Sequence, residues 1–596
     1  MPSRDQLLQQ ARADHSAGKL QAAQAGYQQI LSANPDDLAA LAGRGAVAMQ
    51  TRNFSPAVAI FQRALTIDPN SLDTHINLGI AHAQAGQTER AIEIWNRALT
   101  IDGRCADVYI NLTNAYRKLG RLDDAATAGR RATELDPQHA EARSNLANVL
   151  SAQGRVDEAI VEFRRAIELK PAAVRIHSNL LMNLQYSDSV SPQAVFDEHL
   201  NWARQHADPL TAAAARHPNN RDLLRRLRVG YVSADFREHP ISHFTEPLLA
   251  AHDRASVEVF CFADVHRRDA VTARLQALCE HWHEITGQSH ERAAQLIREH
   301  RIDILVDLAV HTSGHRLQMF ARKPAPVQVT YLGYAATSGI GAMDWRLSDV
   351  HVDPAGLTER YHREQIYRLP RTQWCYNPRD LGGEVRPSPA LRNGFITFGS
   401  FNKLNKISPT IFRMWGRILA RIDDARLLVK AAGLDDPPTR ARFIEQLRSS
   451  VRSAGKELDE QRVRLVGWSD LPTYLSLFNE VDVALDSYPF AGGTTSCNSV
   501  WMGVPLITLA GDVSISRVGA SILHNLELPD RIARTEDEYF ERALRDAADL
   551  AGVAALRESL RARVRASPLM DAQAFARDVE AAYRQMWRQY CDQGSG

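Results

Sequence analysis

The pattern of apolar and polar positions divides the chain into two parts of different character. Up to about residue 186, small and bulky apolar residues recur at helical spacing, and the whole pattern returns every 34 residues. From about residue 227 onward, short β-branched runs alternate with helical stretches. The first pattern predicts paired helices, whereas the second predicts parallel sheets that carry helices on both faces.

Several residue types keep the 34-residue register of the first part. The alanines are Ala23, Ala57, Ala91, Ala125 and Ala159, the prolines are Pro35, Pro69, Pro137 and Pro171, and the bulky residues are Tyr27, Phe61, Trp95 and Phe163. Gly103 and Gly129 are departures from this register. A period of 34 with small residues at the helix crossing is typical of the tetratricopeptide repeat. Because one helix pair cannot bury its apolar face alone, we expect about five units to stack into a solenoid with a concave inner wall.

Asparagine occupies a further position of the register, at Asn77, Asn111, Asn145 and Asn179. It is a poor residue for a helix interior, because its side chain competes for backbone hydrogen bonds. A row of carboxamides along the inner wall could bond the main chain of an extended polypeptide. The alternative is a solvated helix face or a hydrogen bond between repeats. The first interpretation makes the solenoid a binding surface for protein or peptide acceptors.

Length and composition limit the class of protein. With 596 residues, the chain is too long for one core and indicates several domains. Lys and Arg total 71 against 70 for Asp and Glu, so the net charge of +1 predicts neither a nucleic-acid partner nor an anionic membrane surface. We also expect no membrane span and no signal peptide. Six cysteines without paired spacing then favour a cytoplasmic protein.

The second part predicts two blocks of strands. The runs are Leu227–Ser233, Val257–Ala263, Ile302–Ala309 and Val327–Gly333, then Phe395–Phe401, Ala425–Ala431, Val463–Gly467, Val481–Asp486 and Pro505–Ala510. We therefore expect a solenoid over 1–186, a helical transition and linker over 187–226, and Rossmann-like lobes over 227–392 and 393–596. A ligand cleft would lie between the lobes. The terminal helix, counted with the second lobe, should pack back across both.

Two motifs follow predicted strands of the second lobe. Gly492-Gly493-Thr494-Thr495 precedes a helical stretch, and glycines with free amides at a helix N-terminus suit an anion such as a diphosphate. The alternative is a merely tight turn between strand and helix. Lys406 follows the first strand of the lobe, where its ammonium could neutralise a departing phosphate.

Histidines follow two strands of the first lobe. His239 is the leading candidate for a general base and His311 the next, because a histidine near neutral pKa suits proton transfer from a hydroxyl. Each could equally be a structural histidine. No ligand spacing indicates a metal site, and the chain has no D-x-D triplet to chelate a nucleotide diphosphate through a metal. We expect lysine and the helix dipole to carry that charge instead.

Several further motifs stand in one order along the chain. They are His239-Pro240-Ile241-Ser242-His243, Pro324-Ala325-Pro326-Val327-Gln328, Leu332-Gly333-Tyr334, Thr337-Ser338-Gly339, Phe401-Asn402 with Lys406-Ile407, and Gly493-Thr494-Thr495. With the repeats, the chain resembles the O-linked N-acetylglucosamine (O-GlcNAc) transferases of glycosyltransferase family 41 and their plant relatives of the SPINDLY type. The resemblance implies a GT-B fold and a metal-independent, inverting transfer from a nucleotide sugar to protein Ser/Thr hydroxyls, without a cofactor.

The resemblance also implies roles for single residues. His239 matches the histidine regarded as catalytic in these transferases, Lys406 the lysine on the donor diphosphate, and Gly493, Thr494 and Thr495 the phosphate-binding turn. Lys403 stands where the animal enzymes have a glutamine that contacts the nucleotide. Asn498 replaces a carboxylate that usually holds the ribose, and Tyr474 a histidine near the base.

These departures leave the donor open between UDP-GlcNAc, which we expect first, GDP-fucose as in the SPINDLY relatives, and another UDP-hexose. From a different class, the chain could be a repeat scaffold whose transferase half is inactive.

Overall fold

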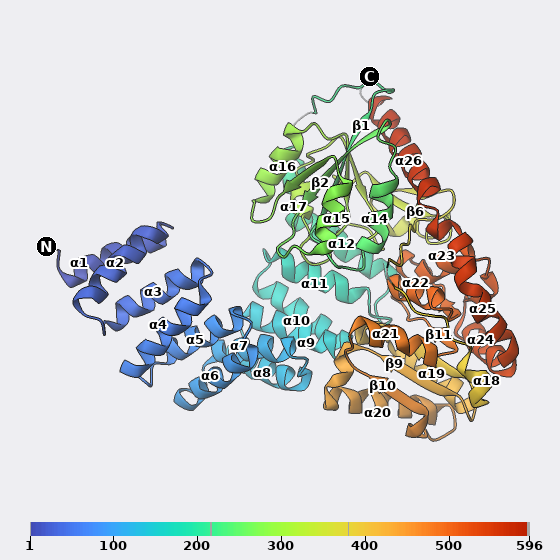
Figure 1. Cartoon of the computed structure of the whole chain (residues 1–596), viewed down its shortest axis with the longest axis horizontal. Helices are drawn as coiled ribbons and strands as arrows, with labels where there is room; N and C mark the ends of the chain where they lie inside the picture. Colours follow the sequence, from blue (N-terminus) through green and yellow to red (C-terminus); the bar gives the residue numbers. More distant parts are fainter. Residues whose placement is uncertain (1, 215–216, 380, 593–596) are drawn as a thin grey trace. The chain divides into compact units, whose positions relative to one another are not determined.

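The computed structural model describes residues 2–214, 217–379 and 381–592. Packing divides the chain into two compact units, one up to Leu150 and one from Ser151 onward. Figure 1 shows their helices and strands in order along the chain. Residues 215–216 of the predicted linker lie outside the described residues.

The predicted helical repeat is confirmed. The first helices of successive pairs are α1 (Arg4–Ser16), α3 (Leu38–Gln50), α5 (Leu72–Gln84), α7 (Ala106–Lys118) and α9 (Ala140–Ala152). Their partners are α2 (Leu20–Ala33), α4 (Phe54–Ile67), α6 (Thr88–Ile101), α8 (Leu122–Leu135) and α10 (Val156–Leu169). Each first helix begins 34 residues after the previous one, so the sequence period is the period of the structure.

Small residues let the repeat helices approach closely. The five register alanines are all fully buried. Within one pair, Gly79 faces the Trp95 ring, and a Cβ added at Gly79 would lie 2.2 Å from Nε1 of that ring. Where the register has Gly129 in place of a bulky residue, Leu146 packs against the glycine instead. The size of each side chain is therefore matched to its neighbour.

The second unit contains two sheets whose strands are all parallel. The first has the order β3-β2-β1-β4-β5-β6-β7 and the second β10-β9-β8-β11-β12-β13. The first sheet contains β1 (Leu227–Ser233), β2 (Val257–Ala263), β3 (His281–Glu284), β4 (Ile304–Asp307), β5 (Val327–Thr330), β6 (Trp345–Asp349) and β7 (Gln365–Leu369). The second contains β8 (Thr397–Ser400), β9 (Arg426–Lys430), β10 (Val463–Val466), β11 (Val483–Leu485), β12 (Leu506–Leu509) and β13 (Ile532–Ala533).

Helices alternate with these strands, as the apolar pattern predicts. In the first lobe they are α14 (Ser242–Ala251), α15 (Ala270–Leu278), α16 (His290–Glu299) and α17 (Leu317–Phe320). The second lobe has α18 (Pro389–Asn393), α19 (Pro409–Arg421), α20 (Pro437–Ser453), α21 (Leu471–Leu477), α22 (Thr494–Trp501), α23 (Val518–Asn525), α24 (Glu536–Ala548) and α25 (Leu550–Ala566). A solenoid followed by two Rossmann-like lobes is the predicted fold class, and it is confirmed.

The last described helix, α26 (Ala572–Asp592), packs on the first lobe (Figure 1). Its Phe575, Tyr583 and Trp587 are buried in one core with Tyr231 of β1. The hydroxyls of Tyr583 and Tyr231 lie 3.2 Å apart. The prediction counted this helix with the second lobe, but its apolar face completes the core of the first.

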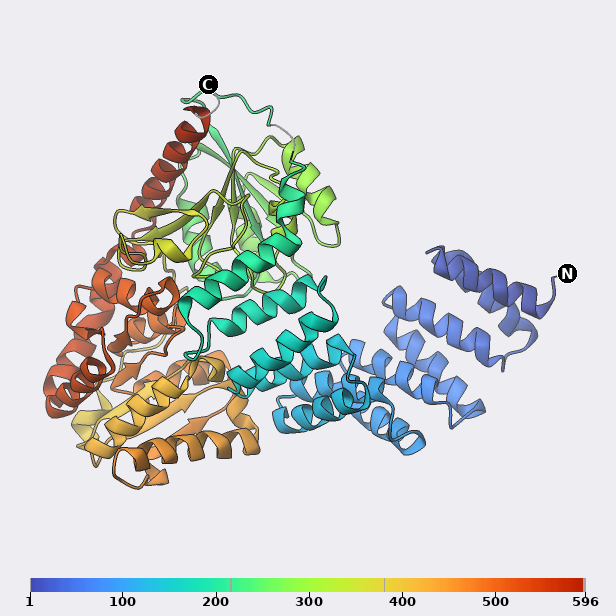
Figure 2. The same cartoon turned by 180° about the vertical axis from the view of Figure 1, so that it is seen from behind.

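Helices of the segment that precedes the lobes also pack against the first lobe. In Figure 2, α11 (Val174–Leu184) and α12 (Pro192–His206), which precede the short helix α13 (Asp208–Thr211), lie against the first lobe. Here His199 is hydrogen-bonded to the Tyr334 hydroxyl at 2.8 Å. The end of the repeat region therefore packs with the lobes, and the division at Leu150 comes earlier than the predicted boundary at residue 186.

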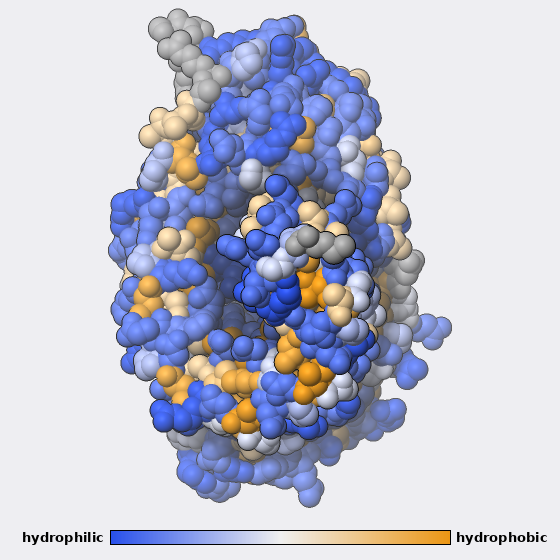
Figure 3. All heavy atoms as spheres, turned by 90° about the vertical axis from the view of Figure 1, so that its left-hand side faces the viewer, coloured by the Kyte–Doolittle hydropathy of each residue, from blue (hydrophilic) through white to orange (hydrophobic). Residues whose placement is uncertain are grey.

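One face of the molecule shows how polar and apolar residues are distributed on the surface. The face drawn in Figure 3 is mostly hydrophilic, with apolar residues in smaller groups. Among the described residues, no helix combines the length and the apolarity that a membrane span requires.

Candidate functional site

Several of the predicted site residues follow the strands at the centre of each sheet. In each lobe the strand order reverses between two neighbours, β1 and β4 in the first and β8 and β11 in the second. Ligands of such sheets bind beyond the carboxyl ends of the strands at this point. His239 follows β1, Lys403 and Lys406 follow β8, and Thr494 follows β11.

A buried carboxylate shapes the loop after β11. Oδ1 of Asp486 accepts from the backbone amides of Ser487 (2.9 Å) and Gly492 (2.7 Å), and Oδ2 accepts from the Thr508 hydroxyl. A Cβ at Gly492 would lie 2.4 Å from Oγ of Ser496 and 3.0 Å from Oδ1 of Asp486. Gly492 is therefore required by the close approach of the loop to its own helix.

The next glycine leaves space at the N-terminus of α22. Gly493 is the N-cap, and a Cβ placed there would meet only ordinary contacts, at 3.9 Å to Trp374 and Val518. The first amides of a helix have no partner within it, so Thr494 and Thr495 present donors and a positive dipole end to this space. These are the properties of an anion site.

Two hydrogen bonds link the segment after β8 to this loop. Thr495 Oγ1 donates to Oδ1 of Asn402 (3.0 Å), and Nζ of Lys406 donates to the carbonyl of Ala491 (3.2 Å). Lys406 ends the short 3₁₀ helix η2 (Leu404–Lys406). The lysine predicted from one motif and the turn predicted from the other are thus brought together.

Lys406 is held in an apolar environment. Its ammonium lies 3.9 Å from the centre of the Phe490 ring. Burial lowers the pKa of Lys406 to about 7, the charge of Asp486 acts in the opposite direction, and Lys403 lowers it further. A bound anion would favour the charged form, so Lys406 can take up a proton together with a phosphate ligand.

Asn498 and Tyr474 are also in contact, together with a residue that the sequence did not suggest. Tyr376, in the segment that follows β7, donates its hydroxyl to Oδ1 of Asn498 (2.8 Å). Nδ2 of Asn498 donates to the Tyr474 hydroxyl (3.3 Å). Because the Tyr474 oxygen accepts this bond, its own hydrogen stays available to a ligand.

His239 lies on the first lobe, in the turn before α14. Its Nδ1 is 3.6 Å from Oδ2 of Asp235 and 3.4 Å from the amide nitrogen of Ile241. Burial lowers the pKa of His239, Asp235 raises it, and the charge of Lys403 from the second lobe lowers it. The ring is therefore neutral at pH 7, and its titration links the two lobes electrostatically.

His311 does not join this group. Its Nε2 donates to the carbonyl of Ser338 (2.9 Å), its Nδ1 lies 3.3 Å from the Ser178 hydroxyl, and the Trp202 ring packs against it. Burial holds the pKa of His311 well below its usual range. Packed between α11, α12 and the first lobe, it has the contacts of a structural histidine.

The register asparagines share one position, the sixth residue of helices α5, α7, α9 and α11. Asn77 is exposed, whereas Asn111, Asn145 and Asn179 are half-buried. Among the described residues, none of the four carboxamides has a protein hydrogen-bond partner. By contrast, Asn114 and Asn148 use theirs on carbonyls of their own helices. The donors and acceptors of the register side chains are thus available to a ligand.

Comparison with known families decides the relationship. The model of "Glycosyl transferase family 41" matches residues 171–381 and 378–579, which is more than half of the chain. The chain belongs to glycosyl transferase family 41. Tetratricopeptide repeat models match this family 41 chain at 8–71, 48–109 and 110–174.

Relatives of this family 41 chain include a SPINDLY protein and a peptide N-acetylglucosaminyltransferase without that name. The probable UDP-N-acetylglucosamine–peptide N-acetylglucosaminyltransferase SPINDLY of Petunia hybrida is 38% identical over 417 residues, which are 69% of this chain and 44% of that protein. The UDP-N-acetylglucosamine–peptide N-acetylglucosaminyltransferase of Caenorhabditis elegans is 25% identical over 484 residues, 61% of this chain and 41% of that protein. The chain thus spans less than half the length of these curated relatives.

A solved structure covers more of the family 41 chain. The O-GlcNAc transferase of Thermobaculum terrenum, solved as a lysine-to-methionine mutant, is 37% identical with a TM-score of 0.81. The match covers 89% of this chain and 99% of that one.

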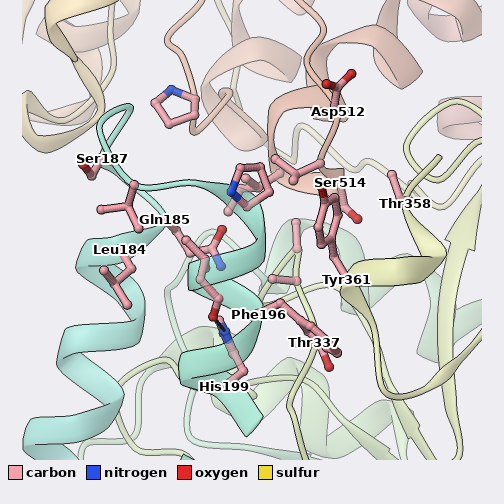
Figure 4. Close-up of a pocket in the computed structure, with 18 of the residues that line it drawn as sticks. Leu184, Gln185, Ser187, Phe196, His199, Thr337, Thr358, Tyr361, Asp512 and Ser514 are labelled. Carbon is pink, nitrogen blue, oxygen red and sulfur yellow. Dashed lines mark hydrogen bonds between the residues drawn. The ribbon is translucent and has the colours of Figure 1, made fainter. Parts of the chain in front are cut away.

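One cavity of the family 41 chain lies apart from the predicted site residues. A cavity of about 270 Å³ lies between the α11–α12 connection and loops of both lobes. Figure 4 shows Leu184, Phe196, Tyr361 and Ser514 around it. Among the described residues, its wall holds none of the predicted site residues, but it includes Tyr488 and Pro489 of the loop that leads to Gly493.

Proposed function

We propose that the chain is a protein O-glycosyltransferase that moves a sugar from a nucleotide-sugar donor to Ser or Thr hydroxyls of proteins, with inversion and without a metal ion. The observation that carries the proposal is the pair of bonds that joins the end of β8 to the turn before α22. These bonds place the Lys406 ammonium beside a loop whose helix N-terminus is open to an anion.

In this proposal the donor diphosphate rests on the first turn of α22, at Thr494 and Thr495. Lys406 pairs with the same diphosphate as its bond to the sugar breaks. Charge preorganised where negative charge develops is worth more in the transition state than in the ground state, because it needs no reorganisation. Lys406 suits this role because it donates to an uncharged carbonyl, so a diphosphate does not have to displace a carboxylate from it.

The acceptor hydroxyl must lose its proton as it attacks the sugar carbon on the face opposite the leaving group. His239 is the proposed base, directly or through water, since its imidazole is neutral at pH 7. Asp235 beside Nδ1 would favour a hydrogen on that atom, which leaves Nε2 free to accept a proton. In the structure the Ile241 amide donates to Nδ1 at 3.4 Å, so a hydrogen on Nδ1 requires Asp235, 3.6 Å away, to take the place of that amide.

Lys403, Tyr474 and Asn498 are proposed to contact the nucleotide. Protein acceptors would bind the register asparagines Asn77, Asn111, Asn145 and Asn179, whose carboxamides are free to bond an extended main chain. N-acetylglucosamine from UDP-GlcNAc is the proposed sugar, in line with the names of the C. elegans and T. terrenum proteins. GDP-fucose stays the alternative, because the neutral Asn498 replaces a carboxylate at the ribose position.

Incubation of the full chain with a panel of nucleotide sugars tests the proposal, with intact-mass readout of the chain itself and of candidate acceptors. We expect a mass increase of one N-acetylhexosamine with UDP-GlcNAc; an increase of one deoxyhexose with GDP-fucose would identify the alternative donor. Thermal-shift titrations with UDP and GDP give an independent readout, because a ligand that binds only the folded state raises its stability. No transfer from any donor, together with no nucleotide binding, would favour the scaffold interpretation.

A further inference from the structure

Lys406 stands at the end of a stack of three side chains from three segments. Its Nζ lies 3.9 Å from the centre of the Phe490 ring. The other partner of that ring is Tyr186, whose ring is stacked on Phe490 with centroids 5.0 Å apart and planes at 30°. Phe490 belongs to the loop after β11, whereas Tyr186 follows α11 and is almost fully buried.

An aromatic ring can hold an ammonium without neutralising it. The negative face of the ring attracts the cation, whereas a carboxylate in the same place would pair with it and compete with a diphosphate. Asp486 is the nearby carboxylate, but its oxygens already accept from Ser487, Gly492 and Thr508. The ring is therefore suited to hold the ammonium while leaving its charge available.

The segment that carries Tyr186 also supports the backbone around Lys406. The Tyr186 hydroxyl lies beside the carboxamide of Asn405, and Nδ2 of Asn405 donates to the Ser151 hydroxyl (3.4 Å). Gly154 packs so closely on η2 that an added Cβ would lie 3.3 Å from the carbonyl oxygen of Leu404. Residues 151–186 thus contact both the helix η2 and the ring that faces the lysine.

We propose that Phe490 and Tyr186 are positioning residues for Lys406: Phe490 holds the ammonium beside the loop that leads to α22, and Tyr186 fixes the Phe490 ring by stacking on it. The inference rests on the proposed function for its catalytic meaning, but the arrangement of the three side chains can be tested without turnover. It assigns the end of the repeat region a direct part in holding the lysine of the site.

The test compares Phe490→Leu and Tyr186→Leu with the conservative variants Phe490→Tyr and Tyr186→Phe. Leucine keeps an apolar side chain but removes the aromatic face, whereas the conservative variants keep it. The first readout is the pH dependence of Lys406 acetylation in the nucleotide-free protein, followed by peptide mass mapping. Only the neutral amine is acetylated. The pH at which acetylation reaches half its maximal rate (the midpoint) therefore reports how strongly the protein stabilises the ammonium. Asp486 and Lys403, the other charged groups that act on Lys406, are unchanged in every variant.

We expect the midpoint to fall by about one pH unit in Phe490→Leu and by less in Tyr186→Leu, with wild-type values in the conservative pair. If the proposed transfer is observed, kcat should fall about tenfold in Phe490→Leu, with a smaller change in the donor KM. An unchanged or raised midpoint in a folded Phe490→Leu protein overturns the proposal, because the ring would then act only by excluding water. Absence of transfer in the wild-type chain would count against the proposed function, while the labelling would still decide the positioning role.

Discussion

At the scale of single residues, the site depends on how a few polar groups share their partners. Asp486 uses its carboxylate to hold the backbone of the loop, which leaves Lys406 with a carbonyl and an aromatic ring instead of an ion pair. A lysine without a salt bridge in an apolar site has a lowered pKa. Binding of an anion therefore strongly stabilises its charged form. The residue-scale predictions follow from this state of Lys406.

Replacement of Lys406 by methionine keeps the aliphatic stem and removes the charge. We expect transfer to fall by about 100- to 1000-fold, as for loss of one preorganised group that stabilises developing negative charge. Initial rates from intact mass measure the effect, and circular dichroism checks the fold. Lys403→Met is the matched control, since Lys403 is exposed and should change mainly the donor KM. A Lys406→Met protein with near wild-type kcat would refute the role.

Nucleotide binding should be coupled to protonation. Burial sets the pKa of Lys406 to about 7 in the free protein, and a bound diphosphate raises it. Above pH 7 the free amine is mostly neutral, so binding of UDP or GDP takes up a proton and the Kd weakens as the pH rises. Calorimetry at pH 8 in buffers of different ionisation enthalpy measures the uptake. Lys406→Arg, which stays charged, should show none.

At the scale of elements, periodicity was the most informative property of the sequence. The repeat helices begin where the 34-residue register places them, because one small residue and one bulky residue per unit fix each helix crossing. Strands β1, β2 and β8 were predictable from long apolar runs. Strands β3, β6, β7 and β13 were not, since they are short or rich in polar residues.

The candidate site was predictable only where it follows strands in sequence. Lys406 and Thr494 belong to the segments that follow β8 and β11, so topology brings them together. Tyr376 and Phe490 carried no comparable signal, because their partners come from distant segments. His311 also follows a strand, yet α11 and α12 cover it, and burial of this kind depends on tertiary packing.

Packing of α26 on the first lobe gives an element-scale prediction. Trp587 is fully buried in the core of that lobe, so Trp587→Ala should reduce its stability by about 3–5 kcal/mol. Hydrogen exchange should then rise in β1 and β4 more than in β8 and β11. Arg588→Ala, one position along the same helix and exposed, is the control and should change stability by less than about 0.5 kcal/mol. Equal loss of protection in both sheets would show that the helix does not act on the first lobe.

At the scale of the whole molecule, the repeats and the lobes are proposed to act on one acceptor. Repeats are suited to extended chains, because each unit offers the same group at a regular spacing. The register asparagines differ from Asn114 and Asn148, which lie three residues further along the same helices and bond their own backbone. This difference provides matched variants for a test of acceptor binding.

The triple variant Asn77→Ala, Asn111→Ala, Asn145→Ala should raise the KM for an intact protein acceptor by about tenfold or more, since each lost hydrogen bond is worth about 0.5–1.5 kcal/mol. We expect kcat to stay unchanged, and a short peptide from the same acceptor to be modified as by the wild type. The control is Asn114→Ala with Asn148→Ala. Steady-state kinetics on both acceptors compares the triple variant with this double variant. Equal KM values for the protein acceptor would rule out the register asparagines as a binding surface.

The position of α26 has a consequence for synthesis of the chain. The core of the first lobe includes Phe575, Tyr583 and Trp587, although all strands of the second lobe are translated before them. On the ribosome, the part of the first-lobe core that α26 covers therefore stays exposed until the second lobe and α26 have emerged from the exit tunnel. Chaperones that shield nascent apolar surface are expected to associate with this chain during that interval.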